Sequence, residues 1–379
     1  MRIGFVCHSG SSGLGGAERC TLEVIGALQS KGVECFCVSP ADGAFHQELL
    51  RRGVPAEIIP YTWWASDQSS LWSRFKRLAR NAVMTLRVAR WLRARGCEAV
   101  YTSTAVICVG AFAAKLLGLR HVWHIYEFGL EDHELVFDLG RTAALRLMDR
   151  LSDVCVVVSQ AILDHYSGGI RPEKLKLVYF AVEEPKNGGP AADAFAASGL
   201  KCAMAGRIDK TKGTEDAIRA VSELSGAGVD AQLVIAGRGP EEEAMKRLSR
   251  ELGLEGRVRF LGLLPDAYGL LKAADVVLTC SRKDALGRVA VEAMYASRPV
   301  VGTRSGGTPE LIREGFNGFL YEPGDAKDLA RQLRKLADKP GLAAELGANG
   351  RRWALERFSE KRLADDLWAI LGSWERHAL

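Results

Sequence analysis

The residues best suited to chemistry lie in the stretch DVVLTCSRKDALGRVAVEAM, where Asp284 and Glu292 stand eight residues apart. The apolar run Val276–Thr279 predicts a strand, Gly287 frees the backbone after it, and a helix is expected to begin near Arg288. The N-terminus of a helix offers unpaired N–H groups and a positive dipole, which suit a bound diphosphate. Glu292, about one turn into this helix, would then reach a hydroxyl group beside that phosphate.

A glycine-rich loop follows the first apolar run of the chain. RIGFVCH predicts a strand, and the next residues, SGSSGLGGAER, hold Gly13, Gly15 and Gly16 before a helix that is expected to start at Ala17. This spacing does not match the G-x-G-x-x-G pattern of dinucleotide-binding loops, so a dehydrogenase is not indicated. Taken alone, the loop does not distinguish a binding loop from an ordinary turn.

Short apolar runs alternate with helical patterns along the whole chain, which is typical of parallel sheets. Residues 1–182 contain five such runs, and residues 200–358 contain five more. Residues 183–199 between them are small, polar and rich in Pro and Gly, as expected of a linker. The final amphipathic segment, 359–379, is expected to pack back on the first domain. The sequence therefore predicts two doubly wound α/β domains.

Composition narrows the class of protein. The chain has 379 residues, 47% hydrophobic and 26% charged, with a net charge of +5, which suits a globular protein of two domains. This mild basicity requires no nucleic-acid partner but suits anionic ligands or membrane surfaces. The nine cysteines show no metal-site spacing, so we expect buried thiols in a reducing compartment. Without a signal peptide or a spanning segment, we expect a cytoplasmic protein.

The stretch around Asp284 and Glu292 resembles the EX7E element of family 4 glycosyltransferases, also called group 1, whose fold is GT-B. The resemblance implies two Rossmann-like domains that face each other across a cleft, the first for the acceptor and the second for the sugar donor. It assigns Glu292 to the donor ribose and Asp284 to the sugar, as a catalytic carboxylate. Asp284 is one methylene shorter than the family's usual Glu, which would alter sugar preference or weaken catalysis. The backbone donors to the diphosphate would be Leu286, Gly287, Arg288 and Val289.

Two cations resemble a second element of this family. AGRIDKTKG follows the expected strand Lys201–Ala205, and the resemblance implies that Arg207 and Lys212 grip the donor diphosphate. The leaving nucleotide gains negative charge as the glycosidic bond breaks, and fixed cations with backbone dipoles would stabilise that charge. No metal ion and no other cofactor are then required. The alternative is that both cations are solvated loop residues.

Other loops resemble the family less specifically. The GGAER segment is similar to the family's first loop, which implies that Gly15 and Gly16 let the backbone approach the donor. In the second half, Gly237 and Leu263 follow strand-like runs whose loops approach the nucleobase and sugar in the family. The alternative for each of these positions is an ordinary turn between a strand and a helix.

The segment HVWHIYEFG places a histidine near the end of another expected strand. The resemblance implies that His124 contacts the donor sugar, with His121 as its competitor, and a structural hydrogen bond as the alternative role. Glu127 is a candidate for the acceptor pocket, as are Glu131 and Asp132.

The segment LWSRFKRLARNAVMTLRVARWLRARG, residues 71–96, holds eight Arg or Lys residues and no acidic residue. Such a helix can lie on an anionic membrane surface, so we hypothesise peripheral docking at the inner membrane face. The alternative is a packing helix with a solvated basic face. The apolar positions that recur at helical spacing are Trp72, Phe75, Ala79, Ala82, Leu86 and Ala89.

These observations favour a retaining glycosyltransferase that moves a sugar from a UDP- or GDP-linked donor to a hydroxyl acceptor. The expected acceptor is a sugar, a glycolipid or a polysaccharide precursor. The resembled family retains configuration by attack on the same face of the sugar, with the leaving phosphate taking the acceptor proton. Two alternatives are a catalytically weak sugar-nucleotide-binding protein, which the Asp284 substitution would suit, and a sugar-nucleotide epimerase.

Overall fold

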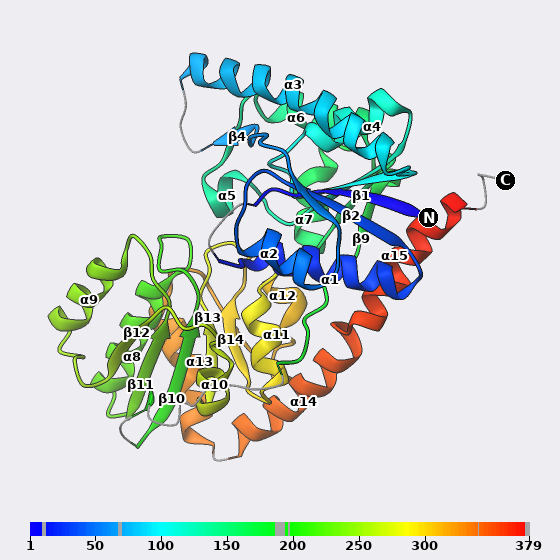
Figure 1. The fold of residues 1–379 in the computed structure, drawn as a ribbon. Coiled ribbons are helices and arrows are strands. Elements are labelled where there is room, and N and C mark those ends of the chain that lie inside the picture. The colour runs from blue at the N-terminus through cyan, green and yellow to red at the C-terminus, as the bar shows by residue number, and fades with distance from the viewer. Residues whose placement is uncertain (10–12, 67–69, 186–193, 196–197, 340, 376–379) are drawn as a thin grey trace. The chain divides into compact units, whose positions relative to one another are not determined.

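A computed structural model of the chain describes residues 1–9, 13–66, 70–185, 194–195, 198–339 and 341–375. The chain divides into two compact units (Figure 1). Unit 1 comprises Met1–Ala181 together with the C-terminal segment from Glu360, and unit 2 comprises Val182–Ser359. The expected linker, 183–199, lies partly outside the described residues, because 186–193 and 196–197 are among those omitted.

Unit 1 is built on a parallel seven-stranded sheet with the order β3-β2-β1-β5-β6-β8-β9. The strands are β1 (Arg2–Val6), β2 (Glu34–Ser39), β3 (Ala56–Ile58), β5 (Ala99–Ser103), β6 (Arg120–Ile125), β8 (Val154–Val157) and β9 (Leu175–Leu177). A separate antiparallel pair joins β4 (Ala65–Ser66) to β7 (Val136–Phe137). The helices are α1 (Gly16–Ser30), α2 (Ala44–Arg51), α3 (Leu71–Ala94), α4 (Val109–Leu117), α5 (Leu130–His133), α6 (Arg141–Leu151), α7 (Gln160–Ser167) and α15 (Glu360–Glu375), with a 3₁₀ turn at Pro172–Lys174.

Unit 2 is built on a parallel six-stranded sheet with the order β12-β11-β10-β13-β14-β15. The strands are β10 (Leu200–Ala205), β11 (Ala231–Ala236), β12 (Val258–Gly262), β13 (Val276–Thr279), β14 (Val300–Thr303) and β15 (Gly318–Tyr321). The helices are α8 (Thr214–Gly226), α9 (Glu242–Glu251), α10 (Tyr268–Ala273), α11 (Arg288–Tyr295), α12 (Thr308–Leu311), α13 (Ala326–Asp338) and α14 (Leu342–Arg357).

The central strands confirm the predicted parallel sheets. The ten apolar runs all form strands, since helices cover parallel strands on both faces and such strands are apolar throughout. The prediction missed β3, β9 and β15 of the parallel sheets, and both strands of the antiparallel pair, β4 and β7. Both β3 and β9 are three-residue edge strands, too short to carry a pattern. All nine cysteines lie in the described part of the chain, are buried and form no disulfide, as expected.

The C-terminal helix α15 belongs to unit 1 and packs against α1. Leu363, Leu367 and Leu371 are fully buried within the unit 1 core. The Lys31 ammonium on α1 lies 2.6 Å from the carboxylate of Asp365. Although α15 is last in the sequence, it therefore completes the unit that contains the first strand.

The face of helix α3 that packs on the core is not the predicted apolar stripe. Its buried positions include Met84, Val88, Trp91 and Leu92, together with Ala89, the one member of the predicted stripe that is buried. The other members of that stripe are exposed. Among the described residues, no helix is long and apolar enough to cross a membrane.

Candidate active site

The strand order of unit 2 reverses between β10 and β13. These two strands pair in parallel, with Cys202 beside Val276, while the chain continues from β10 to one side and from β13 to the other. At such a switch point the loops that leave the two strands diverge and open a crevice at the carboxyl edge of the sheet. The two loops are 206–213 and 280–287, which carry Arg207, Lys212 and Asp284.

The two loops are packed directly against each other. The N–H of Arg282 donates to the carbonyl of Thr211 at 2.7 Å. Gly213 has a φ of +64°, and a Cβ at this position would lie 2.0 Å from the carbonyl oxygen of Cys280. Only glycine therefore permits this close approach, which fixes the position of Lys212 relative to the second loop.

A third loop supports Asp284 from another side. The N–H of Gly307 donates to the Asp284 carbonyl at 2.8 Å. Gly306 has a φ of +57°, and a Cβ there would lie 2.3 Å from the same oxygen. Close backbone packing against Asp284 therefore accounts for the glycine at position 306.

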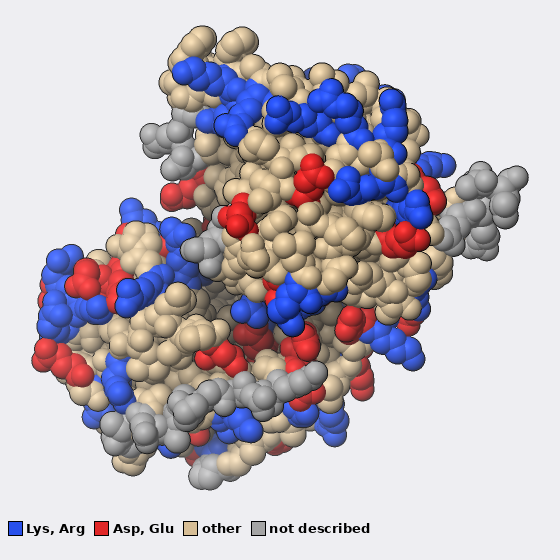
Figure 2. All heavy atoms as spheres, in the orientation of Figure 1, with Lys and Arg blue, Asp and Glu red and all other residues tan. Residues whose placement is uncertain are grey.

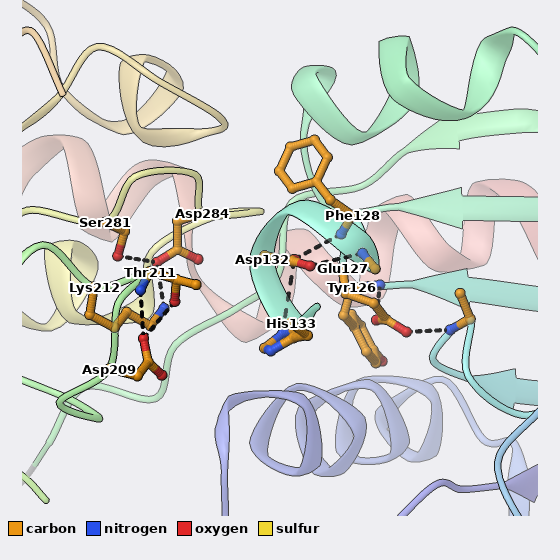
Figure 3. A network of polar contacts seen from close by, with 12 residues as sticks. Tyr126, Glu127, Phe128, Asp132, His133, Asp209, Thr211, Lys212, Ser281 and Asp284 are labelled. Carbon is orange, nitrogen blue, oxygen red and sulfur yellow. Dashed lines mark hydrogen bonds and ion pairs between the residues drawn. The ribbon is translucent and has the colours of Figure 1, made fainter. Parts of the chain in front are cut away.

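The side chains of Lys212 and Asp284 meet in this structure (Figure 3). The Lys212 Nζ lies 3.2 Å from Oδ2 of Asp284, and the Ser281 hydroxyl donates to the same oxygen at 3.1 Å. The two charged side chains are 30% and 26% exposed, so solvent screens their attraction. An anionic ligand could therefore compete with Asp284 for the lysine at little cost.

Arg207 lies on the same loop but points to a different carboxylate. Its Nε lies 3.2 Å from Asp209, and 69% of its side chain is exposed. Asp209 in turn accepts from both the N–H and the hydroxyl of Thr211, at 2.9 and 2.7 Å. The structure therefore brings Lys212, but not Arg207, into contact with Asp284.

Helix α11 begins at Arg288, as predicted, and Gly287 is its N-cap. Gly287 has no side chain and therefore makes no side-chain capping hydrogen bond to the start of this helix. Leu286 is buried, whereas Gly287, Arg288 and Val289 are partly exposed. The Glu292 carboxylate, in the second turn, is partly exposed and has no partner among the described residues. A carboxylate without a partner among the described residues and a helix N-terminus with a glycine cap thus lie on one element.

Gly237 and Leu263 lie at the same carboxyl edge of unit 2, after β11 and β12. Gly237 is buried, and a Cβ at its position would lie 1.7 Å from the carbonyl oxygen of Gly206. Packing between neighbouring loops therefore accounts for this glycine without a ligand. Leu263 is 75% exposed, so its side chain is open to solvent.

The sheet of unit 1 has its own switch point, between β1 and β5. Gly15 and Gly16 lie there at the start of α1, with Gly15 as the N-cap, and both are exposed. A Cβ at Gly15 would lie 2.7 Å from Oε2 of Glu18. The glycine therefore makes room for a carboxylate in the first turn of the helix.

A contact between the side chains of His8 and Glu18 was missed by the sequence analysis. His8 is the second residue after β1, and its Nε2 lies 3.5 Å from Oε1 of Glu18. Burial alone would raise the pKa of Glu18, but interactions with His8 and Ser9 outweigh it and lower the pKa to about 2. The available signal was a Glu three residues after the Gly15 cap, where acids favour helix N-termini.

His124 is the second-to-last residue of β6, near the strand end as expected. It is fully buried, and its Nδ1 lies 2.6 Å from the hydroxyl of Tyr101 and 3.1 Å from that of Tyr126. Burial lowers its pKa to about 3, so the imidazole is neutral. Its Nε2 is buried without a partner in the described part of the chain. Contact of His124 with a sugar stays a prediction. Tyr126 is the first residue after β6.

His121, the competitor of His124, has hydrogen-bond partners on both ring nitrogens. Its Nε2 lies 2.8 Å from the Thr102 hydroxyl, and its Nδ1 lies 3.1 Å from the Ser152 hydroxyl. Burial lowers its pKa to about 3. These contacts describe a structural residue in the interior of unit 1.

Glu127 has both carboxylate oxygens engaged with the backbone (Figure 3). The N–H of Ala105 donates to Oε1 at 2.6 Å, and the N–H of Tyr126 donates to Oε2 at 3.0 Å. Burial, with the nearby charge of Asp132, raises the pKa of Glu127 to about 8. The side chain is 5% exposed, so in this structure it connects the loops after β5 and β6. A role in acceptor binding stays a prediction.

Asp132 and Glu131 also make contacts within unit 1. The carboxylate of Asp132 accepts from the N–H groups of Phe128 and Gly129, each at 2.8 Å, and so stabilises the start of α5. Glu131 lies 3.5 Å from His165. Both acids therefore hold the segment that follows Glu127.

Comparison with protein families places the chain in a known class. Residues 194–353 match the family described as Glycosyl transferases group 1, and residues 14–184 match the one described as Glycosyltransferase Family 4. A 2-deoxystreptamine glucosyltransferase of Streptomyces kanamyceticus is 32% identical over 282 residues, which cover 66% of this chain and 70% of that protein. The chain therefore belongs to the group 1, or family 4, glycosyltransferases, and its two Rossmann-like sheets are those of the GT-B fold.

Two further relatives show how far the similarity extends. The lipopolysaccharide core biosynthesis glycosyltransferase LpsD of Rhizobium meliloti is 37% identical over 174 residues, 46% of this chain and 48% of that protein. The chain thus spans about half the length of several curated relatives that it matches. Anabaena HepE, solved in complex with UDP, superposes with a TM-score of 0.79 at 24% identity, covering 98% of this chain and 100% of that one. This structural similarity shows that the GT-B fold covers nearly the whole chain.

Proposed function

We propose that this protein is a retaining glycosyltransferase that moves a sugar from a nucleotide-diphosphate donor to a hydroxyl acceptor. The observation that carries the proposal is the arrangement at the switch point of unit 2. There, Lys212 contacts Asp284, and the loop that carries Asp284 leads into α11, which has a glycine N-cap and carries Glu292. A diphosphate would suit the lysine and the helix N-terminus, and a ribose would suit the free carboxylate.

The proposed chemistry depends on stabilising the leaving group. As the bond between the sugar and the diphosphate breaks, negative charge grows on the phosphate oxygens, and the sugar becomes oxocarbenium-like. Lys212, Arg207 and the N–H groups at the start of α11 would stabilise that charge without a metal ion. Asp284, released from Lys212, would contact the sugar.

Retention of configuration would follow from attack on the same face of the sugar. The acceptor hydroxyl would pass its proton to the departing phosphate, so no side chain needs to be a strong base. The neutral His124 fits this scheme, because an imidazole with a pKa of about 3 is a poor proton acceptor near neutral pH. Its role would be limited to a hydrogen bond.

The donor and acceptor classes are inferred from relatives. HepE has been solved with UDP-glucose, which supports a UDP-linked donor, with a GDP-linked donor as the alternative. The name of LpsD supports a glycolipid or polysaccharide precursor as acceptor. We place the reaction in the cytoplasm, at the inner membrane face, where such a precursor would be presented.

Ligand binding and turnover test the proposal. UDP or GDP should raise the melting temperature of the protein, because a ligand that binds only the folded state stabilises it. Incubation with UDP- or GDP-sugars should release the nucleotide, with EDTA making no difference, and NMR of the transferred sugar should show the anomeric configuration of the donor. Binding without hydrolysis or transfer would instead identify a sugar-nucleotide-binding protein, and C2 inversion of the donor would identify an epimerase.

Two variants test the assigned residues. Glu292→Ala should lower transfer about 10- to 100-fold, the effect of losing a charged hydrogen bond. Glu356→Ala, which removes an exposed carboxylate from α14, is its control and should leave transfer unchanged. His124→Ala should also lower transfer. Full activity in both the Glu292 and His124 variants, with circular dichroism unchanged, would contradict their assignments.

A further inference from the structure

The solvent-facing side of α3 carries a row of large apolar side chains. Leu71 is 83% exposed, Trp72 63%, Phe75 61%, Val83 55% and Leu86 51%. Apolar side chains scattered singly over a surface need no explanation, but several on one helix face form a patch, which soluble proteins rarely expose without a partner.

This exposed row is not needed to hold the helix on its domain. The opposite side of α3 is already buried, with Met84, Val88, Trp91 and Leu92 packed inward. At the beginning of the helix, Arg77 forms an ion pair with Asp138, and Ser70 caps the first turn through the N–H of Ser73. Helix α3 is therefore anchored by one face, and the other is left to water or to a partner.

The charges around the row are all of one sign. Helix α3 contains seven Arg or Lys residues and no acidic residue. Arg87, Arg90 and Arg93 are exposed and have no partner in the part of the chain that the structure describes. Lys76 lies over the ring of Trp72, 5.1 Å from its centre. Figure 2 shows Lys and Arg side chains gathered over α3, with uncharged surface among them.

We propose that this face of α3 docks on an anionic lipid bilayer. Leu71, Trp72 and Phe75 would enter the boundary between headgroups and acyl chains, while Arg87, Arg90 and Arg93 would contact anionic headgroups. A nucleic acid would use the charges but would leave the aliphatic row in water, so a bilayer fits both features. The docking inference rests on the proposed function only for the reason why the protein would bind a membrane, because docking would bring the enzyme to a lipid-linked acceptor.

Vesicle sedimentation of the full-length protein tests the surface. We expect the protein to sediment with phosphatidylcholine vesicles that contain 30% phosphatidylglycerol, and to bind pure phosphatidylcholine at least tenfold more weakly. The double variant Trp72→Ser, Phe75→Ser should bind the anionic vesicles at least tenfold more weakly than the unmodified protein. Changing Arg87, Arg90 and Arg93 to Gln should remove most of the salt dependence of binding.

Two matched variants serve as controls. Leu355→Ser replaces a side chain that is 45% exposed on α14 of unit 2, and Arg331→Gln with Arg334→Gln removes exposed cations from α13. Neither should change vesicle binding. The docking proposal is overturned if the unmodified protein ignores anionic vesicles, or if the Trp72 and Phe75 variant binds like the controls. It is also overturned if sedimentation equilibrium shows a dimer that this variant abolishes, because the face would then bind a second copy.

Nucleotide binding separates this proposal from the proposed function. The Trp72 and Phe75 variant should keep the same thermal shift with UDP or GDP and the same hydrolysis of donor in solution. Vesicle binding without any nucleotide effect would remove the transferase proposal and leave the docking surface. A nucleotide effect without vesicle binding would remove the docking proposal and leave the transferase proposal.

Discussion

At the scale of single residues, the Lys212–Asp284 ion pair ties together the two loops of the candidate donor site. The resemblance aligns Asp284 with the family's usual Glu, and its oxygen Oδ2 is held by both Lys212 and Ser281. The shorter side chain thus has a defined position on its own loop. We infer that a donor diphosphate would draw Lys212 away from Asp284 and leave that carboxylate to the sugar.

This view predicts the effect of removing the lysine. Lys212→Met should weaken UDP or GDP binding about 10- to 100-fold, because a charge-assisted hydrogen bond to phosphate is lost. Isothermal titration calorimetry would measure the change. Lys246→Met is a matched control, because Lys246 is also ion-paired but lies on α9. Equal nucleotide affinity in the two variants would refute the role of Lys212.

Glu127 predicts a pH dependence of stability. Its pKa in the folded chain is raised to about 8, above that of an exposed Glu, so the folded state binds the proton more tightly than the unfolded state. Its contribution to stability is therefore present below about pH 4.5 and is lost as pH rises toward 8. Between pH 5 and 8.5, melting temperature should fall more for the unmodified protein than for Glu127→Gln. Glu98→Gln, on the surface, is the control, and its melting temperature should fall with pH as steeply as that of the unmodified protein. An equal fall of melting temperature with pH in all three proteins would disprove the prediction.

At the scale of elements, loops at the carboxyl edges of the sheets do the positioning. The helices α1 and α11 both begin at a glycine cap without a capping side chain, one in each unit. In unit 2, glycines let three loops pack backbone against backbone around Asp284. The position of the charged groups is thus set by backbone contacts between loops.

The contact at Gly213 predicts a large cost for a single methyl group. Gly213 and Gly253 have nearly the same φ, +64° and +67°, but a Cβ at Gly253 would meet no atom within 4 Å. Alanine at either position should cost about 1 kcal/mol for its backbone conformation. Gly213→Ala should cost about 1–3 kcal/mol more because it clashes with the Cys280 carbonyl. Urea unfolding measures both, and equal losses of stability would show that the two loops can separate freely.

At the scale of the whole molecule, the chain returns to its first unit at its end. Helix α15 supplies three fully buried leucines to the core that contains β1. Because the two segments of unit 1 are joined only through unit 2 along the chain, folding of that unit requires a contact between the sequence ends.

Truncation of one of these leucines tests the importance of that contact. Leu367→Ala should lower the free energy of unfolding by about 2–5 kcal/mol, as for other buried leucines. Leu355→Ala, on the exposed side of α14, should change it by less than about 0.5 kcal/mol. Thermal unfolding followed by circular dichroism would show the difference. A Leu367 variant as stable as the Leu355 variant would mean that α15 is dispensable for unit 1.

Much of this fold could be predicted from local patterns. Central parallel strands are apolar throughout, so their pattern identifies them, and Val276–Thr279 and the start of α11 at Arg288 were found in this way. The short edge strands β3 and β9 were not found, because three residues carry no period. His124 was placed near the end of its strand, as the structure has it, but the local pattern did not show that the hydroxyl groups of Tyr101 and Tyr126 contact its ring.

The amino-acid sequence by itself determined the class of the protein, because a family motif and an alternating apolar pattern are written in neighbouring residues. Only the tertiary structure decided which charges meet. Lys212 and Asp284 are 72 residues apart, and His8 reaches Glu18 across a glycine loop. It also decided which face of α3 remains in solvent, since a helix with apolar residues on both sides can pack by either. The physical reason is that burial and ion pairing depend on distances between elements, which parallel-sheet topology sets and local sequence does not.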